Sequence, residues 1–295
     1  MKINDSISRK IFINVNYAIL ISFALLCVLP VINIAAISFS ATSAADAGEV
    51  SLLPKEFTLA SYQYVFLNHD FMRAFFISLQ RVFLGLVINM FLTILTAYPL
   101  SKKNKDLRLR TAYCWFFVVT MLFNGGLIPL YMLVTSLKMT NTIWALVLPS
   151  AVPVFNLILL INFFRQIPEE YAEAASVDGA SHWIVLFKMF VPMSTPVLAT
   201  LTLFVIVGHW NSWFDGIIFM SNVKKFPLQS YLQTVVINVS DASMLSIENL
   251  KDAGKISDKT IKAARVFLAA LPVMFVYIPL QKYFVQGITL GGIKG

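Results

Sequence analysis

Charged residues are scarce in this 295-residue chain: Asp, Glu, Lys and Arg together make up 13% of it. That is about half of the charged share of an average soluble domain. Hydrophobic residues make up 58%, and phenylalanine alone occurs 25 times. The composition excludes an ordinary soluble domain. It indicates a membrane protein that crosses the bilayer several times and carries no large soluble appendage.

Cysteine, histidine and catalytic motifs are also scarce. The two cysteines, Cys27 and Cys114, both lie in apolar runs, so we expect small buried side chains and no disulfide framework. The three histidines are far apart and lack metal-ligand spacing, so no metal site is expected. The Gly-Lys pair in Ala253–Ile256 lacks the upstream glycine and the Ser or Thr of a phosphate-binding loop. The sequence therefore predicts no nucleotide site and no catalytic cluster.

The net charge of +8 comes from basic residues that cluster at the ends of apolar runs. This placement indicates a membrane topology signal and not nucleic-acid binding. The segment Ser101–Arg110 holds five basic residues against Asp106 alone, which predicts that this loop is cytoplasmic. Because two predicted spans separate this loop from residues 1–10, the N-terminus is expected on the same side.

Six apolar runs are long enough for membrane spans, each of which needs about 20 residues. These runs cover residues 11–39, 71–100, 111–136, 140–164, 183–207 and 265–283. We predict an all-α polytopic membrane protein with six transmembrane helices, both termini cytoplasmic, and one transmembrane domain over 11–295. Residues 165–182 would form a cytoplasmic loop and residues 208–264 an outer segment. Within the outer segment, the charged stretch 251–262 is expected to be a solvated helix or loop.

Two features interrupt the predicted spans. Arg81 lies deep in the second span, where a charge is expected to face a partner or a water-filled path. Asn124-Gly125-Gly126 divides the third span. Irregular backbone at membrane depth is tolerated only beside protein or a polar cavity. The break is therefore either a broken helix that lines a translocation path or a glycine kink for helix packing, and the sequence leaves both open.

The polar segment between the fourth and fifth spans predicts a short helix over residues 168–178. Pro168 can start a helix because its missing N–H would be unpaired there. Glu169 and Glu170 follow in the first turn, where the helix dipole favours negative charge. Three alanines continue the helix, and Gly179 permits the tight turn that ends it. Small side chains on such a helix let the surface of another protein approach closely.

This segment also carries a spaced motif. Glu173-Ala174-Ala175 is followed by three residues, Gly179, nine residues and then Met189-Phe190-Val191-Pro192. The spacing resembles the EAA loop of ABC importer permeases, in which E-A-A, three residues, G and nine residues precede I-x-L-P. The departures, methionine for isoleucine and valine for leucine, are conservative. Asp178-Gly179-Ala180 resembles the carbohydrate branch of the family, and the likeness to maltose-type permeases extends from about residue 57 to 295.

The resemblance implies a type I importer permease that translocates a carbohydrate, an oligosaccharide in particular, in a bacterial cytoplasmic membrane. It also implies a second homologous permease, two ATPase subunits and an extracytoplasmic solute-binding protein. ATP and magnesium would bind to the ATPase, so this chain would bind no cofactor and would not be an enzyme. The residues implied in ATPase coupling are Glu169, Glu170, Glu173, Ala174, Ala175, Asp178 and Gly179.

A substrate path is less clearly marked. The candidates are Asn89, Asn124, Trp210, Asn211 and Trp213, because indole faces stack on sugar C–H surfaces and amides bind hydroxyl groups. The two tryptophans fit an interfacial aromatic belt equally well.

Two alternatives belong to other classes of protein. A secondary carrier or channel acting alone would follow an ion gradient, but the few acidic residues mostly lie in predicted loops, whereas proton-coupled carriers place carboxylates within spans. A membrane enzyme would need a catalytic cluster, and the sequence offers none.

Overall fold

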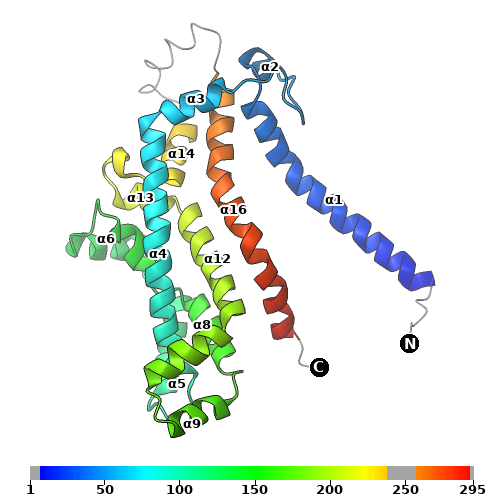
Figure 1. Cartoon of the computed structure of the whole chain (residues 1–295). Helices are drawn as coiled ribbons and strands as arrows, with labels where there is room; N and C mark the ends of the chain where they lie inside the picture. The colour runs from blue at the N-terminus through cyan, green and yellow to red at the C-terminus, as the bar shows by residue number, and fades with distance from the viewer. Residues whose placement is uncertain (1–6, 238–256, 293–295) are drawn as a thin grey trace. The chain divides into compact units, whose positions relative to one another are not determined.

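The computed structural model of the chain describes residues 7–237 and 257–292 (Figure 1). Within these residues, three helices are by themselves long and apolar enough to cross a membrane. They are α1 (Ile7–Ser38), α4 (His69–Ser101) and α16 (Asp258–Gly292). These helices cover the predicted first, second and sixth spans.

The predicted third, fourth and fifth spans each correspond to a bent pair of helical segments, so the described residues hold up to six spans. The third contains α5 (Arg110–Leu122) and α6 (Leu127–Ser136), bent by 112°. The fourth contains α7 (Trp144–Val147), the 3₁₀ turn η1 (Leu148–Ser150) and α8 (Val154–Phe164), with a bend of 45°. The fifth ends in α12 (Thr195–Asn211) after a bend of 83°.

The bend between α5 and α6 has a local cause. Gly126 adopts φ +89°, which a side chain would strain, and its N–H donates to the Asn124 side-chain oxygen at 2.9 Å. A turn of 112° is far larger than a packing kink, so the structure favours the broken-helix alternative. That this break lines a translocation path stays a prediction.

The bend in the fifth span follows from its prolines. The chain passes through α10 (His182–Val185), the π-helical turn η2 (Leu186–Phe190) and α11 (Val191–Met193) before α12 begins. Pro192 and Pro196 lack the N–H groups that would continue a helical ladder. Ser194 lies between them, fully buried, and its hydroxyl has no hydrogen-bond partner. The segment after the EAA motif is therefore divided and not a single straight span.

The described residues fall into two compact units. One contains those up to Phe71 together with those from Val235 to Leu271. The other contains Met72–Thr234 and the residues from Pro272 onward. The predicted single domain over 11–295 thus contains two compact units.

The first unit is held together by an aromatic and polar core. Phe39 stacks on Phe57 and Tyr62, with ring centroids 5.6 and 4.7 Å apart. Tyr62 lies in α3 (Ala60–Leu67), and α2 (Thr42–Asp46) contributes buried alanines to the same unit. The Lys259 amine, in the first turn of α16, donates to the Ala45 carbonyl at 2.6 Å.

The structure corrects one expectation in this unit. Residues 251–256 lie outside the described residues, but residues 258–262 form the start of α16, so the helix alternative holds there and only its solvation is wrong. Thr260 and Ile261 are 1% and 2% exposed. The lysines at 259 and 262 make this turn look solvated in the sequence, although the residues between them are buried.

The second unit contains both features described in the next subsection. Its core joins α4, α8, the η2 turn and α12, and α12 lies beside α8 (Figure 1). Beyond α12 follow α13 (Phe214–Phe219), η3 (Val223–Lys225) and α14 (Leu228–Ile237). The Leu228 N–H donates to the Ser78 hydroxyl at 2.7 Å, which ties the start of α14 to α4. These contacts fix the helices around the two features described next.

Candidate functional site

The predicted short helix is present as α9 (Glu169–Val177). Pro168 was predicted as the first residue of the helix. In the structure it is the N-cap, and the helix begins one residue later, at Glu169. The helix ends at Val177 with Asp178 as its C-cap, and Gly179 adopts φ +76°, the left-handed conformation that favours glycine. The helix and its terminating turn therefore follow from the sequence.

The two faces of α9 differ. Glu170, Glu173, Ala174 and Asp178 are exposed. On the other face Ala172 and Ala175 pack inward against the hydrophobic core of the second unit, as does Ala180 just after the helix. Ala175 was predicted to allow close approach of a partner, but it contacts its own chain. Only Ala174 of the two motif alanines faces outward.

The Lys102–Arg110 segment is tied to α9 by charge. Lys103 and Glu169 form an exposed ion pair, and their hydrogen bond raises the pKa of the lysine and lowers the pKa of the glutamate. Lys102 lies over the rings of Tyr98 and Phe190, 4.7 and 4.8 Å from their centroids. Burial lowers the pKa of Lys102, although nearby acids oppose the shift. The Lys103–Glu169 pair joins α9 to the end of α4, whereas Lys102 joins that end to the η2 turn.

This ion pair gives a first prediction. Lys103→Glu would place two carboxylates together and release α9 from the α4–α5 loop, while an exposed pair adds little to folding stability. We expect the thermal unfolding midpoint to be unchanged and ATP-driven uptake by the assembled transporter to fall. The charge-swapped variant, Lys103→Glu with Glu169→Lys, should recover uptake. A double variant as impaired as the single one would contradict an orienting role for the pair.

The second feature is a polar stripe along α4. Ser78, Arg81, Gly85, Asn89 and Thr93 recur at intervals of three or four residues, so they share one face of the helix. The four with side chains are buried, each at 3% exposure or less. An otherwise apolar helix thus presents a polar row to the interior of the second unit.

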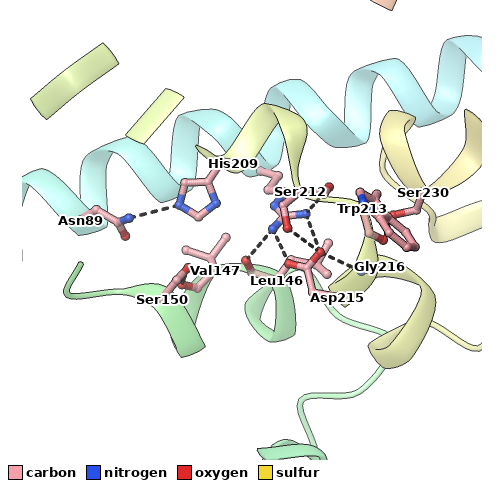
Figure 2. A network of polar contacts seen from close by, with 11 residues as sticks. Asn89, Leu146, Val147, Ser150, His209, Ser212, Trp213, Asp215, Gly216 and Ser230 are labelled. Carbon is pink, nitrogen blue, oxygen red and sulfur yellow. Dashed lines mark hydrogen bonds and ion pairs between the residues drawn. The ribbon is translucent and has the colours of Figure 1, made fainter. Parts of the chain in front are cut away.

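Arg81 is the centre of a largely buried network, and Figure 2 labels its partners Leu146, Ser212 and Asp215. It forms a bidentate ion pair with Asp215 of α13, with one N–O distance of 3.1 Å. It also donates to the carbonyls of Ser212 and Leu146, at 3.2 and 3.4 Å. Asp215 further accepts hydrogen bonds from the Ser212 hydroxyl and the Gly216 N–H, both at 2.9 Å. The predicted need of Arg81 for a partner is confirmed.

The sequence assigned Asp215 to the outer segment, residues 208–264, and gave it no partner. Its carboxylate turns back onto a side chain of α4 that is 2% exposed. Sequence reasoning could have paired the two, because an intramembrane arginine needs a carboxylate and Asp215 follows the fifth span directly. The argument that acidic residues are confined to loops is correspondingly weaker.

His209 of α12 rests on Gly85 of α4. A side chain at Gly85 would collide with the His209 ring. Four residues farther along α4, the Asn89 amide lies 3.2 Å from the His209 Nε2 atom, also visible in Figure 2. The glycine is therefore required for close approach of the two helices and for this hydrogen bond.

Gly85 gives a second prediction. Gly85→Ala should destabilise the protein by about 1–3 kcal/mol, because overpacking forces His209 out of its position. The matched control is Gly208→Ala on α12, where an added Cβ meets nothing within 4 Å. That variant should be neutral or stabilising by up to about 1 kcal/mol, since alanine is the better helix former. Equal unfolding midpoints for the two variants, measured in detergent, would show that α4 and α12 are not tightly packed at Gly85.

A cavity of about 470 Å³ lies beside this stripe. Its polar lining comes from α4, η1, α8, α12 and α13: Arg81, Asn89, Ser150, Asn156, His209, Ser212 and Asp215. Of the predicted path residues, only Asn89 lines it. Asn124, Asn211 and Trp213 are exposed elsewhere. Trp210 is buried and packs edge-on against Phe75, with ring centroids 5.8 Å apart.

Sequence reasoning missed most of this lining, although the spacing of the α4 stripe was a usable signal. Among the described residues, no group of three or more His, Cys, Asp or Glu side chains is placed to hold a metal ion.

Comparison with known proteins decides the family. Residues 15–290 match the family described as "Binding-protein-dependent transport system inner membrane component". The chain belongs to this family. It is 36% identical to the polygalacturonan/rhamnogalacturonan transport system permease protein YtcP of Bacillus subtilis, over 97% of this chain and 99% of that protein. It is 37% identical to protein LplC of the same organism, over 91% and 90% of the two chains.

A solved structure agrees with this assignment. A chain of a bacterial ABC transporter involved in the import of the acidic polysaccharide alginate superposes with a TM-score of 0.88 at 30% identity, covering 96% of this chain and all of that one. The chain thus has the fold of a type I ABC importer permease and is a multi-pass membrane protein of the inner-membrane permease family.

Proposed function

We propose that this chain is the transmembrane permease subunit of an ATP-driven importer for an oligosaccharide, delivered by an extracytoplasmic solute-binding protein. The names of the relatives support the substrate class, since they include permeases for polygalacturonan, rhamnogalacturonan and alginate. The family description supports dependence on a binding protein. One observation carries the mechanism: an exposed acidic helix, α9, is packed by its other face onto the helical core.

The coupling step is derived from the two faces of α9. Glu170, Glu173, Ala174 and Asp178 would contact the ATPase, and Gly179 would fix the turn after the helix. The inward alanines pack against the hydrophobic core that joins α4, α8, η2 and α12, so a displacement of α9 would be passed to that core. The bend before α12 would then convert that displacement into a change of access along the fifth span. Glu169 acts differently from its neighbours, because it is held by Lys103 and orients the helix.

The assembly would contain a second homologous permease and two ATPase subunits. ATP and magnesium would be bound there, so this subunit transmits movement and does not catalyse hydrolysis. The basic segment Ser101–Arg110 and α9 are joined by the Lys103–Glu169 pair, so they lie on the same side of the membrane. Both chain ends and this side would be cytoplasmic, by the positive-inside bias. Asn124, Asn211, Trp210 and Trp213 remain candidate path residues; three of them are exposed in the single chain, where a second permease could complete a path.

The test is purification of the detergent-solubilised complex followed by reconstitution into proteoliposomes. We expect mass spectrometry to find a homologous permease, a P-loop ATPase and a solute-binding protein with the chain. Uptake of the sugar carried by that binding protein should require ATP on the side of the membrane where the ATPase lies. It should not follow an imposed ion gradient. A stable single species that transports without ATP would overturn the proposal in favour of a secondary carrier, for which Arg81 and Asp215 would be the coupling groups.

A further inference from the structure

A second cavity in the second unit lies where three of the candidate spans end. It has a volume of about 370 Å³, and its lining comes from the end of α4, the start of α5, the end of α8, the start of α9 and the η2 turn. Four basic side chains and one acidic side chain contribute to this lining: Lys102, Lys103, Arg110, Arg165 and Glu169. The lining therefore has a formal charge of +3.

The two arginine side chains converge on one atom. The Arg110 Nε–H donates to the Leu100 carbonyl at 2.8 Å, and the Arg165 Nη2 atom donates to the same oxygen at 3.4 Å. That carbonyl lies in the last turn of α4, where the helix dipole supplies only about half a negative charge. Among the described residues neither arginine forms an ion pair, and Glu169, the one acid in the lining, is held by Lys103. Two guanidinium groups thus converge without a full negative charge between them.

The depth of the cavity indicates what supplies the missing charge. α4 ends at Ser101, α5 begins at Arg110 and α8 ends at Phe164, so all three reach the membrane surface here. Tyr113 and Trp115, in the first two turns of α5, are 51% and 61% exposed. Exposed tyrosine and tryptophan side chains are typical of the headgroup level of a membrane. The cavity therefore lies at the depth of the lipid phosphates.

We propose that this cavity binds the phosphate group of an anionic phospholipid from the adjoining leaflet. A guanidinium group presents its N–H donors in a planar fork that matches phosphate oxygens. Lys102, which lies over the rings of Tyr98 and Phe190, adds a third positive charge to the site. Basic pockets between spans hold anionic lipid headgroups in other membrane proteins. The proposal goes beyond sugar transport, and only its assignment to the cytoplasmic leaflet rests on the proposed function.

Two other anions have suitable chemistry. Free inorganic phosphate would meet the same donors, and a carboxylate of an ATPase would reach the cavity beside α9. The lipid is favoured because apolar side chains adjoin the basic groups, as the junction of a headgroup with its acyl chains requires: Phe164, Ile167, Ala172 and Phe190. The positive-inside bias accounts for basic residues on this side of the membrane, but not for the convergence of two arginines on one oxygen.

The test is lipid binding to the full-length chain, measured by native mass spectrometry in a nonionic detergent. The probes are phosphatidylglycerol, which is anionic, and phosphatidylcholine, which is zwitterionic, with inorganic phosphate as a competitor. Arg165→Gln removes an exposed guanidinium group from the cavity, and Arg110→Gln removes the other in an independent variant. The matched control is Arg108→Gln, which removes an exposed arginine of the same loop that does not line the cavity.

We expect one phosphatidylglycerol molecule to bind more tightly than phosphatidylcholine and to resist inorganic phosphate. Each cavity variant should raise its Kd about fivefold, which corresponds to about 1 kcal/mol for one basic residue near a membrane surface. Arg108→Gln should change the Kd much less. Bound phosphatidylglycerol should remain when the chain is assembled with its ATPase.

Four results would overturn the proposal. An equal effect of Arg108→Gln would show a general surface potential and not a site. Phosphatidylcholine binding as tight as that of phosphatidylglycerol would show that the negative charge is not recognised, and displacement by inorganic phosphate would identify free phosphate as the ligand. Release of the lipid on assembly with the ATPase would assign the arginines to a protein carboxylate. Sugar uptake is not measured in any of these arms, so the proposed function is tested separately.

Discussion

Asp215→Ala is expected to destabilise the folded protein by about 3–5 kcal/mol, the usual cost of removing one partner from a buried ion pair. Arg81, at 2% exposure, would keep its charge and retain only two carbonyl acceptors. The loss should appear as a lower unfolding midpoint and a smaller monodisperse peak in size-exclusion chromatography. The change spans α4 and α13, so packing around the cavity should loosen with it.

A double variant separates charge from shape. Arg81→Met with Asp215→Asn removes both charges and keeps most of the volume, and replacing a buried pair in this way is often close to neutral. We expect it to recover most of the lost stability. As a control, Glu49→Gln breaks the exposed pair with Lys55 and should change the midpoint little. Stability of the double variant as low as that of Asp215→Ala would show that the pair is not what holds these helices together.

Glu173→Lys is expected to abolish ATP-driven uptake while leaving the protein folded. The side chain is exposed on the outward face of α9, so its loss costs no packing, but a reversed charge would oppose docking of the complementary ATPase surface. Uptake into proteoliposomes and ATP hydrolysis stimulated by the solute-binding protein should fall together. The unfolding midpoint should not move.

The matched control for this variant is Asp46→Lys, an equal reversal at an exposed acid of α2 in the first unit. It should leave both activities intact. If Glu173→Lys transports normally in a fully assembled complex, α9 does not dock through its acidic face. If Asp46→Lys is equally inactive, the effect reflects net charge and not the position of the helix.

Local features were predictable from sequence because their causes are local. The start, end and acidic first turn of α9 follow from Pro168, Glu169, Glu170 and Gly179, all within one short polar segment. The break at Gly126 is likewise encoded by adjacent residues. The positions of α1 and α4 follow from long, mostly apolar runs.

Features that depend on distant residues were not predictable in the same way. Arg81 clearly needed a partner, but Asp215 lies 134 positions away and sequence alone did not bring it to α4. The inward orientation of Ala175 depends on packing against the core, which the motif does not specify. The cavity beside the α4 stripe is formed by five segments that are far apart in the sequence. The sequence therefore identified Asn89 as a polar residue within a span, but it did not show that His209 and Asn156 line the same cavity.

Photo-crosslinking from α9 tests the central claim most directly. Val177 is 88% exposed at the end of the helix, so a photoreactive amino acid there should not disturb folding. The same substitution at Val223 of η3, 58% exposed, is the control. On irradiation of membranes containing the assembled complex, we predict an adduct from position 177 that contains a P-loop ATPase, and none with that protein from position 223. Absence of the ATPase from the adduct at 177, or equal capture from both positions, would contradict the assignment of α9 as the coupling helix.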